Sequence, residues 1–180
     1  MFGGPDWDRL DKDFLRAPLQ LARDRLTPAS LAWLEALPVT IVIDGFTIIH
    51  ASPTDPLWEY VTTPDQAGRA LELISTQHGL HGHTHVPANW VMPLPTSAGA
   101  TVAGNLGPGP IDLAGARHYL NPGSVGLPRD GDPRASLVIL DLEAGTAEFR
   151  RVAYDIDATA RAIRAANLPE FLATRIYEGR

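Results

Sequence analysis

Three of the six histidines in the sequence lie within five consecutive positions, in the stretch LHGHTHVP over residues 80–87. Imidazole nitrogens are the commonest protein ligands of borderline transition metals. Side chains two apart in an extended segment point to the same face, so His83 and His85 could face one ion. His81 shares their parity, and we expect it to be packed or beside the ligands. The cluster predicts a metal-binding strand end or loop, and a solvated histidine loop is the alternative.

A fourth histidine, His50, stands at the end of an expected strand. Residues 39–44 and 46–50 are β-branched runs joined by Asp44-Gly45, a strong hairpin signal. The turn-rich loop 51–56 follows. A histidine at a strand end can be purely structural, but loops at strand ends often carry functional groups.

The segment between these histidines should position them at one edge of a sheet. Thr63-Pro64 begins a predicted helix that runs to about Gln77, with Ala67, Ala70, Leu71 and Ile74 on one face. The histidine cluster comes directly after it. Strand, loop, helix and histidine loop is the order expected where strand ends meet at one cleft.

Other segments complete a mixed α/β chain. Helical spacing occurs over residues 14–26 and in a helix opened by Thr27-Pro28 that runs through Leu37, in which leucines should face inward. The remaining expectations are a strand at 118–120 leading into the turn 121–126, a hairpin of strands 136–142 and 147–154, a helix capped by Asp157 and a last helix from Pro169.

We expect one domain over residues 1–180. Residues 1–13 read as an irregular lead-in, and residues 93–117, rich in Pro, Gly, Ala and Ser, as a long loop or a ragged hairpin.

Composition narrows the classes of function. The net charge of −6 gives no basic footprint for nucleic acid, and no apolar stretch is long enough to span a membrane. The absence of cysteine rules out thiolate metal sites. Without a visible secretory signal, the expected location is cytoplasmic.

Taken together, these motifs resemble the calcineurin-like metallophosphoesterases, in particular their small bacterial phosphodiesterase branch. The resemblance covers most of residues 27–172, and the matching pieces are TPASLAWLEALP, IIHASPTDPLWEYV, GHTHVP, LNPGSVGLPRDGDPRASLVILD and YDIDATARAIRAANLPEFL. It implies an αββα sandwich, incomplete at the N-terminus.

The resemblance also implies roles for individual residues. His50 and His83 would bind one divalent transition metal ion (Mn, Fe, Zn or Ni) and His85 a second one. Asn121, Gly123 and Ser124 would shape the site as turn residues, and Asp55 and Arg129 would order its loops; no catalytic residue is assigned. Two such ions clamp a phosphate ester and activate a water for attack on phosphorus. The implied activity is hydrolysis of a phosphate-ester small molecule, as a phosphodiesterase.

The family's earlier motifs, D-x-H, G-D-x-x-D and G-N-H-D or G-N-H-E, are absent. The sequence therefore reads as the C-terminal portion of such an enzyme. A sheet face left open would be covered by a complementing N-terminal segment or by a second copy in a homo-oligomer. Two alternatives stay open: a catalytically silent fragment or scaffold that pairs with another chain through this sheet, and a mononuclear zinc hydrolase with three histidine ligands and Asp55 as the base.

Overall fold

The computed structural model describes residues 13–94, 103–104, 106 and 109–180. Its chain forms two compact units, one of residues 1–38 and 155–178 and one of residues 39–154 and 179–180. The lead-in expected at residues 1–13 lies, except for Asp13, outside the described residues. The expectation of a single domain stays a prediction.

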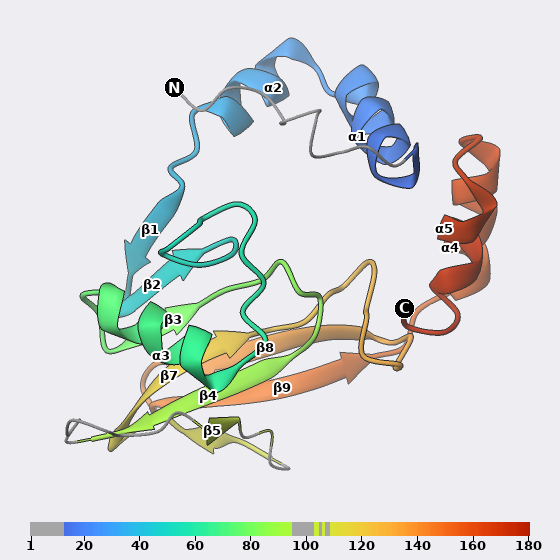
Figure 1. Cartoon of the computed structure of the whole chain (residues 1–180). Coiled ribbons are helices and arrows are strands. Elements are labelled where there is room, and N and C mark those ends of the chain that lie inside the picture. The colour runs from blue at the N-terminus through green and yellow to red at the C-terminus, as the bar shows by residue number, and fades with distance from the viewer. Residues whose placement is uncertain (1–12, 95–102, 105, 107–108) are drawn as a thin grey trace. The chain divides into compact units, whose positions relative to one another are not determined.

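The larger unit is built on a six-stranded mixed sheet in the order β1-β2-β3-β7-β4-β5 (Figure 1). Its strands are β1 Thr40–Ile43, β2 Phe46–Ile49, β3 His78–Leu80, β4 Ala88–Pro93, β5 Ala103–Gly104 and β7 Ala116–Asn121. Strands β2, β3 and β7 run parallel to one another. The predicted hairpin at Asp44-Gly45 is confirmed, since β1 and β2 pair antiparallel and both turn residues have positive φ.

A second sheet has three strands in the order β6-β9-β8. These are β6 Ile111–Asp112, β8 Ala135–Asp141 and β9 Thr146–Val152, so the predicted hairpin between residues 136 and 154 is confirmed. The segment expected as a loop or ragged hairpin, 93–117, contributes the short strands β5 and β6 where it is described.

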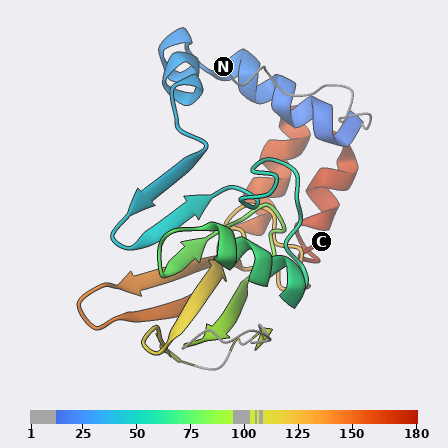
Figure 2. The same cartoon turned by 60° about the vertical axis from the view of Figure 1, so that its left-hand side comes forward.

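Each face of the six-stranded sheet is covered in part, whereas all four residues of the edge strand β1 are exposed. Helix α3, Pro64–Leu73, packs on one face, where Leu71 and Ile74 meet Met92 and Tyr119. On the other face, Phe46 and Leu120 form a second core with residues of the three-stranded sheet, among them Ala147, Val138 and Phe149. This layering agrees with the predicted α/β class with mixed sheets (Figure 2).

Helix α3 begins as predicted but ends earlier. Thr63 and Gln66 form a capping box at its start. The helix stops at Leu73 instead of near Gln77, and Ile74 is extended. The guanidinium of Arg117 on β7 donates to the carbonyl oxygens of Ile74 and Thr76, so a long-range partner satisfies these carbonyls outside a helix.

The smaller unit is helical. It contains α1 Asp13–Arg25, α2 Pro28–Glu35, α4 Ile156–Ala165 and α5 Glu170–Arg175. Arg164 forms an ion pair with Glu170, and the hydroxyl of Tyr177 donates to Asp157.

Two expectations about these helices are wrong. The cap of α4 is Asp155, whose carboxylate accepts from the backbone N–H of Ala158, and Asp157 lies in the first turn. The leucines of α2 were expected to face inward, but none of its residues is buried and Trp33 is 63% exposed. The spacing of apolar residues predicts a helix, but it does not predict whether another element packs on that helix and buries its leucines.

Candidate metal and phosphate site

Three loops meet at the carboxyl ends of the parallel strands β2, β3 and β7. His50 follows β2, the histidine loop 81–87 follows β3, and the turn that begins at Pro122 follows β7. Backbone hydrogen bonds join the loops: the N–H of Gly82 donates to the carbonyl of His50 at 2.8 Å, and the N–H of Arg129 donates to the carbonyl of His85 at 3.2 Å. Ligand sites of open α/β sheets form at this edge.

His50 and His83 are brought together. Nε2 of His50 lies 3.0 Å from Nδ1 of His83, and the ring centroids are 4.8 Å apart. The ring of Tyr60 lies against that of His83, with 4.2 Å between centroids and an angle of 32° between the ring planes. Burial lowers the pKa of both imidazoles, and the neighbouring His50 lowers that of His83 further. Both rings are therefore neutral near pH 7, which is the form that binds metal ions.

The 3.0 Å separation suits a shared ion. Two imidazole nitrogens that each lie about 2.0–2.1 Å from one ion are about 2.9–3.4 Å apart at ordinary coordination angles. The donor pair thus fits the metal that the sequence predicts at His50 and His83. Any other ligands of such an ion would have to come from groups other than these two imidazoles.

His85 is not part of this pair. Its Nδ1 lies 2.8 Å from the carbonyl oxygen of Leu127, so the ring is tied to the 122–134 loop. Over the part of the chain that the structure describes, no group of three or more His, Asp or Glu side chains could hold a metal ion. This arrangement gives no support to a mononuclear site with three histidine ligands.

The expectation that His83 and His85 share the geometry of an extended segment is wrong. Both have positive φ, 64° and 60°. Such left-handed conformations turn the chain sharply, so the alternation of side chains along a strand does not apply. His81 is packed, as expected: it is buried and stacks on Tyr119 with 4.2 Å between ring centroids.

Asn121 connects the loops by hydrogen bonds. Its buried Nδ2 donates to the carbonyl of Gly82 at 2.8 Å and to Oγ1 of Thr84 at 2.9 Å, and its Oδ1 accepts from the N–H of Gly123 at 2.9 Å. These contacts hold the histidine loop against the turn. An amide side chain is needed, because it donates and accepts at once.

Gly123 and Ser124 shape the turn. Gly123 has φ of 83°, and a Cβ added there would lie 2.8 Å from the side chain of Ser136. The hydroxyl oxygen of Ser124 accepts from the backbone N–H groups of Gly126 and Leu127. Both residues stabilise the turn that reaches His85.

Asp55 orders the loop after His50. Its Oδ1 accepts from the backbone N–H groups of Leu57 and Trp58, at 3.2 and 3.1 Å. Sequence reasoning missed Tyr60, which lies ten residues from His50 and covers His83. An exposed aromatic residue in a loop carries no signal for such a contact before the loop is folded.

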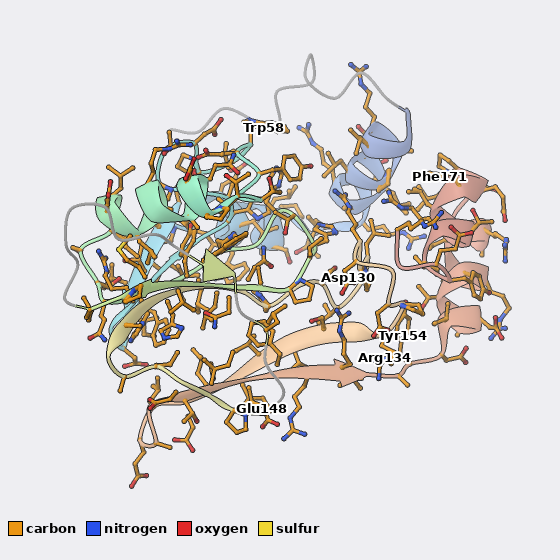
Figure 3. All side chains as sticks on the ribbon, turned by 60° about the horizontal axis from the view of Figure 1, so that its bottom comes forward. Trp58, Asp130, Arg134, Glu148, Tyr154 and Phe171 are labelled. Atoms are coloured by element: carbon orange, nitrogen blue, oxygen red, sulfur yellow. The ribbon has the colours of Figure 1, made fainter. Side chains whose placement is uncertain are left out.

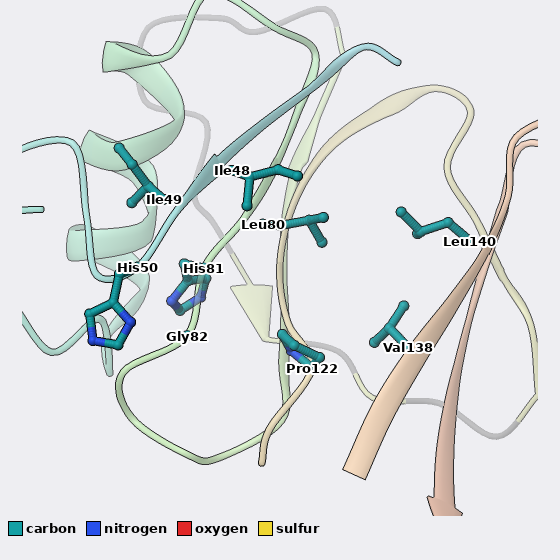
Figure 4. A pocket seen from close by; sticks show the side chains of 9 residues that line it. All are labelled: Ile48, Ile49, His50, Leu80, His81, Gly82, Pro122, Val138 and Leu140. Carbon is teal, nitrogen blue, oxygen red and sulfur yellow. The ribbon is translucent and has the colours of Figure 1, made fainter. Parts of the chain in front are cut away.

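An apolar cavity of about 290 Å³ lies beside the site, between the two sheets (Figure 4). Its lining residues are Ile48, Ile49, His50, Leu80, His81, Gly82, Pro122, Val138 and Leu140. The side chains of Val138 and Leu140 on β8 face those of Ile48 and Leu80 across it.

No described helix is long and apolar enough to cross a membrane.

Comparison with known proteins gives three relevant matches. A metallophosphoesterase from Sphaerobacter thermophilus is 35% identical with a TM-score of 0.78, over 87% of this chain and 64% of that one. An uncharacterized protein of Methanocaldococcus jannaschii is 36% identical over 160 residues, which are 84% of this chain and 60% of that protein. A hypothetical protein from Pyrococcus horikoshii OT3 shares the fold at 20% identity, with a TM-score of 0.72 over 100% of this chain and 67% of that one.

No family model matches the sequence. The chain spans 60% and 64% of the length of the first two proteins.

Proposed function

The chain is a relative of the calcineurin-like metallophosphoesterases, and from this premise we propose that it forms the histidine side of a metal-dependent phosphodiesterase site. The observation that carries the proposal is the pair of neutral imidazoles, His50 and His83, with ring nitrogens 3.0 Å apart at the carboxyl ends of parallel strands. The metallophosphoesterase of Sphaerobacter thermophilus, at 35% identity, supports the class of chemistry.

In the proposed reaction, a water attacks phosphorus, the bond between phosphorus and the leaving oxygen breaks, and the alcohol leaves with a proton. The divalent ions, Mn, Fe, Zn or Ni, would neutralise phosphate oxygens and lower the pKa of the attacking water. His50 and His83 would hold one ion, and His85 would bind the other. Tyr60 and Asn121 would fix the orientation of the ligands, as partners behind metal-binding histidines do. The substrate would be a small phosphate ester, hydrolysed in the cytoplasm.

Metal titration of the purified full chain tests this proposal. We expect calorimetry to detect binding of Mn²⁺ or Zn²⁺, with an affinity about 10–100-fold lower in His50→Ala and in His83→Ala. His78→Gln is the matched control, because His78 is a partly buried histidine at the start of β3, and contacts His118 and Phe46. Equal metal affinity in all four proteins would overturn the assignment.

Hydrolysis gives the second readout. With metal present, we expect release of nitrophenol from bis(p-nitrophenyl) phosphate that is lost in His83→Ala. Faster turnover of the monoester p-nitrophenyl phosphate would argue for a phosphomonoesterase instead.

A second candidate function is pairing with another polypeptide through the exposed sheet, either a complementing segment or a second copy. Ile41, Val42 and Ile43 of the edge strand β1 are all exposed, and the inner face of the edge strand β8 borders the open apolar cavity. Edge strands with exposed apolar residues are templates for strand addition. Sedimentation at increasing concentration checks the homo-oligomeric form, and a monomer at every concentration would exclude it.

A further inference from the structure

The loop that follows β7 contains an arginine, Arg129, that has no acidic partner among the described residues. Asp130 pairs with Arg151, and Asp132 pairs with Arg134 at 2.6 Å. Both carboxylates of this loop are thus bound by arginines other than Arg129, at the end of the three-stranded sheet where Figure 3 shows Asp130 and Arg134. Arg129 forms no ion pair with any carboxylate in the described part of the chain, and its buried Nε has no hydrogen-bond partner there.

The backbone of Arg129 is hydrogen-bonded to the histidine loop. Its backbone N–H donates to the carbonyl of His85, and the carbonyl of Leu127, two residues earlier, lies 2.8 Å from Nδ1 of the His85 ring. These two contacts hold the segment that contains Arg129 against the histidine loop.

An unsatisfied guanidinium nitrogen in a partly buried position needs an explanation, because such a group loses hydration without gaining a partner. The neighbouring histidines supply no negative charge, because an imidazole is either neutral or cationic. An oxyanion would satisfy both the charge and the N–H groups. Guanidinium forks bind the oxygens of phosphate in two parallel hydrogen bonds.

We propose that Arg129 binds a phosphate oxygen of the substrate and positions the phosphate group beside His50 and His83. This role rests on the proposed function for the identity of the anion. The ion pairs of the loop leave Arg129 without a carboxylate partner in the described part of the chain, and this observation does not depend on that function.

Titration with inorganic phosphate tests the inference on the full chain after removal of metal with EDTA. Chemical shifts of backbone amides detect weak binding, and we expect wild-type shifts in the 81–87 and 122–134 loops. Arg129→Gln should weaken phosphate binding by about 10-fold or more, and Arg129→Lys, which keeps the charge but not the fork, by less. Arg134→Gln is the matched control from the same loop and should bind phosphate as the wild type does. No binding by the wild type, or equal binding by Arg129→Gln, would overturn the inference.

Hydrolysis separates this inference from the proposed function. In an active chain, Arg129→Gln should raise KM for the phosphodiester by about 10-fold or more, while the affinity for metal stays that of the wild type. If the KM of Arg129→Gln is unchanged while activity still depends on His83, the role of Arg129 is refuted and the proposed function stands. If the wild type hydrolyses neither substrate but binds phosphate, and Arg129→Gln loses this binding, the proposed function is refuted and the role of Arg129 stands. Urea midpoints equal to the wild type would show that the variant is folded.

Discussion

The contact between Gly79 and Tyr119 lies at the centre of the larger unit. A Cβ added at Gly79 would lie 2.5 Å from a ring carbon of Tyr119, closer than side-chain atoms approach. Tyr119 is buried between α3 and the sheet, and its ring also stacks on His81. The ring cannot move away without disturbing both neighbours. Gly79 therefore permits the close packing that holds His81 in place.

We predict that Gly79→Ala destabilises the protein by about 1–3 kcal/mol, the usual cost of overpacking a core. Urea unfolding measures the free energy. Gly126→Ala is the control, since a Cβ at Gly126 would meet nothing within 4 Å. Equal stability of the two variants would mean that the Tyr119 ring has room to shift.

Residue types predict parts of the site but not its geometry. The spacing of His50 and the histidine cluster after strands places them correctly at one sheet edge, because parallel strands end on the same side. The backbone conformations of His83 and His85, with positive φ, and the packing of Tyr60 on His83 depend on contacts far apart in sequence. Local sequence patterns do not predict such contacts.

Among the elements, α3 shows how local sequence determines a boundary. The side chain of Thr63 accepts from the backbone N–H of Gln66, while the Gln66 side chain accepts from the backbone N–H of Thr63. The sequence predicts this start because both partners lie within four residues. The end of the helix depends on Arg117, about forty residues away, and could not be predicted from local spacing.

We predict that Thr63→Ala lowers the free energy of unfolding by about 0.5–2 kcal/mol, through loss of the cap. Urea denaturation measures it. Thr54→Ala is a control in the preceding loop, where the backbone N–H rather than the side chain makes the hydrogen bond to Ser52. A loss of the same size in both variants would show that the capping box contributes nothing specific.

The edge strand β1 is the element most exposed to association. Val42 is 62% exposed on a strand whose outer edge pairs with no other strand of the described residues. A lysine there would keep the strand and repel a second strand, as charged residues do at natural sheet edges.

We expect Val42→Lys to reduce concentration-dependent association, measured by light scattering, without a change in urea midpoint. Leu73→Lys is the matched control, since Leu73 is also 62% exposed but lies on α3. An equal reduction by both lysines would point to net charge, and no association of the wild type would contradict the exposed-sheet hypothesis.

For the molecule as a whole, the comparisons match only part of the length of its relatives. The chain spans 64% of the metallophosphoesterase of Sphaerobacter thermophilus, and the described residues bring His50 and His83 together with ring nitrogens 3.0 Å apart. The mixed fold class was predictable from alternating strands and helices. The division into two compact units was not, because no linker composition marks Pro38 or Asp155.

Stability of the whole chain should depend on pH through histidines away from the site. Burial, together with the neighbouring His118 and Arg117, lowers the pKa of His78 to about 4. Its Nδ1 accepts from the backbone N–H of His118. Burial also lowers the pKa of His118, which Asp112 partly offsets. In the unfolded chain these imidazoles titrate near the ordinary value of about 6.5.

The unfolded state therefore binds more protons than the folded state between about pH 4 and pH 6.5, so the free energy of unfolding should rise with pH across this window and level off above it. Urea denaturation at intervals of half a pH unit measures the slope. His78→Gln keeps an acceptor for the N–H of His118 but cannot titrate, so it should flatten the slope between pH 4 and 6.5. A slope equal to that of the wild type would assign the pH dependence to other groups, and stability that falls with rising pH in this window would contradict the neutral state of His78 in the fold.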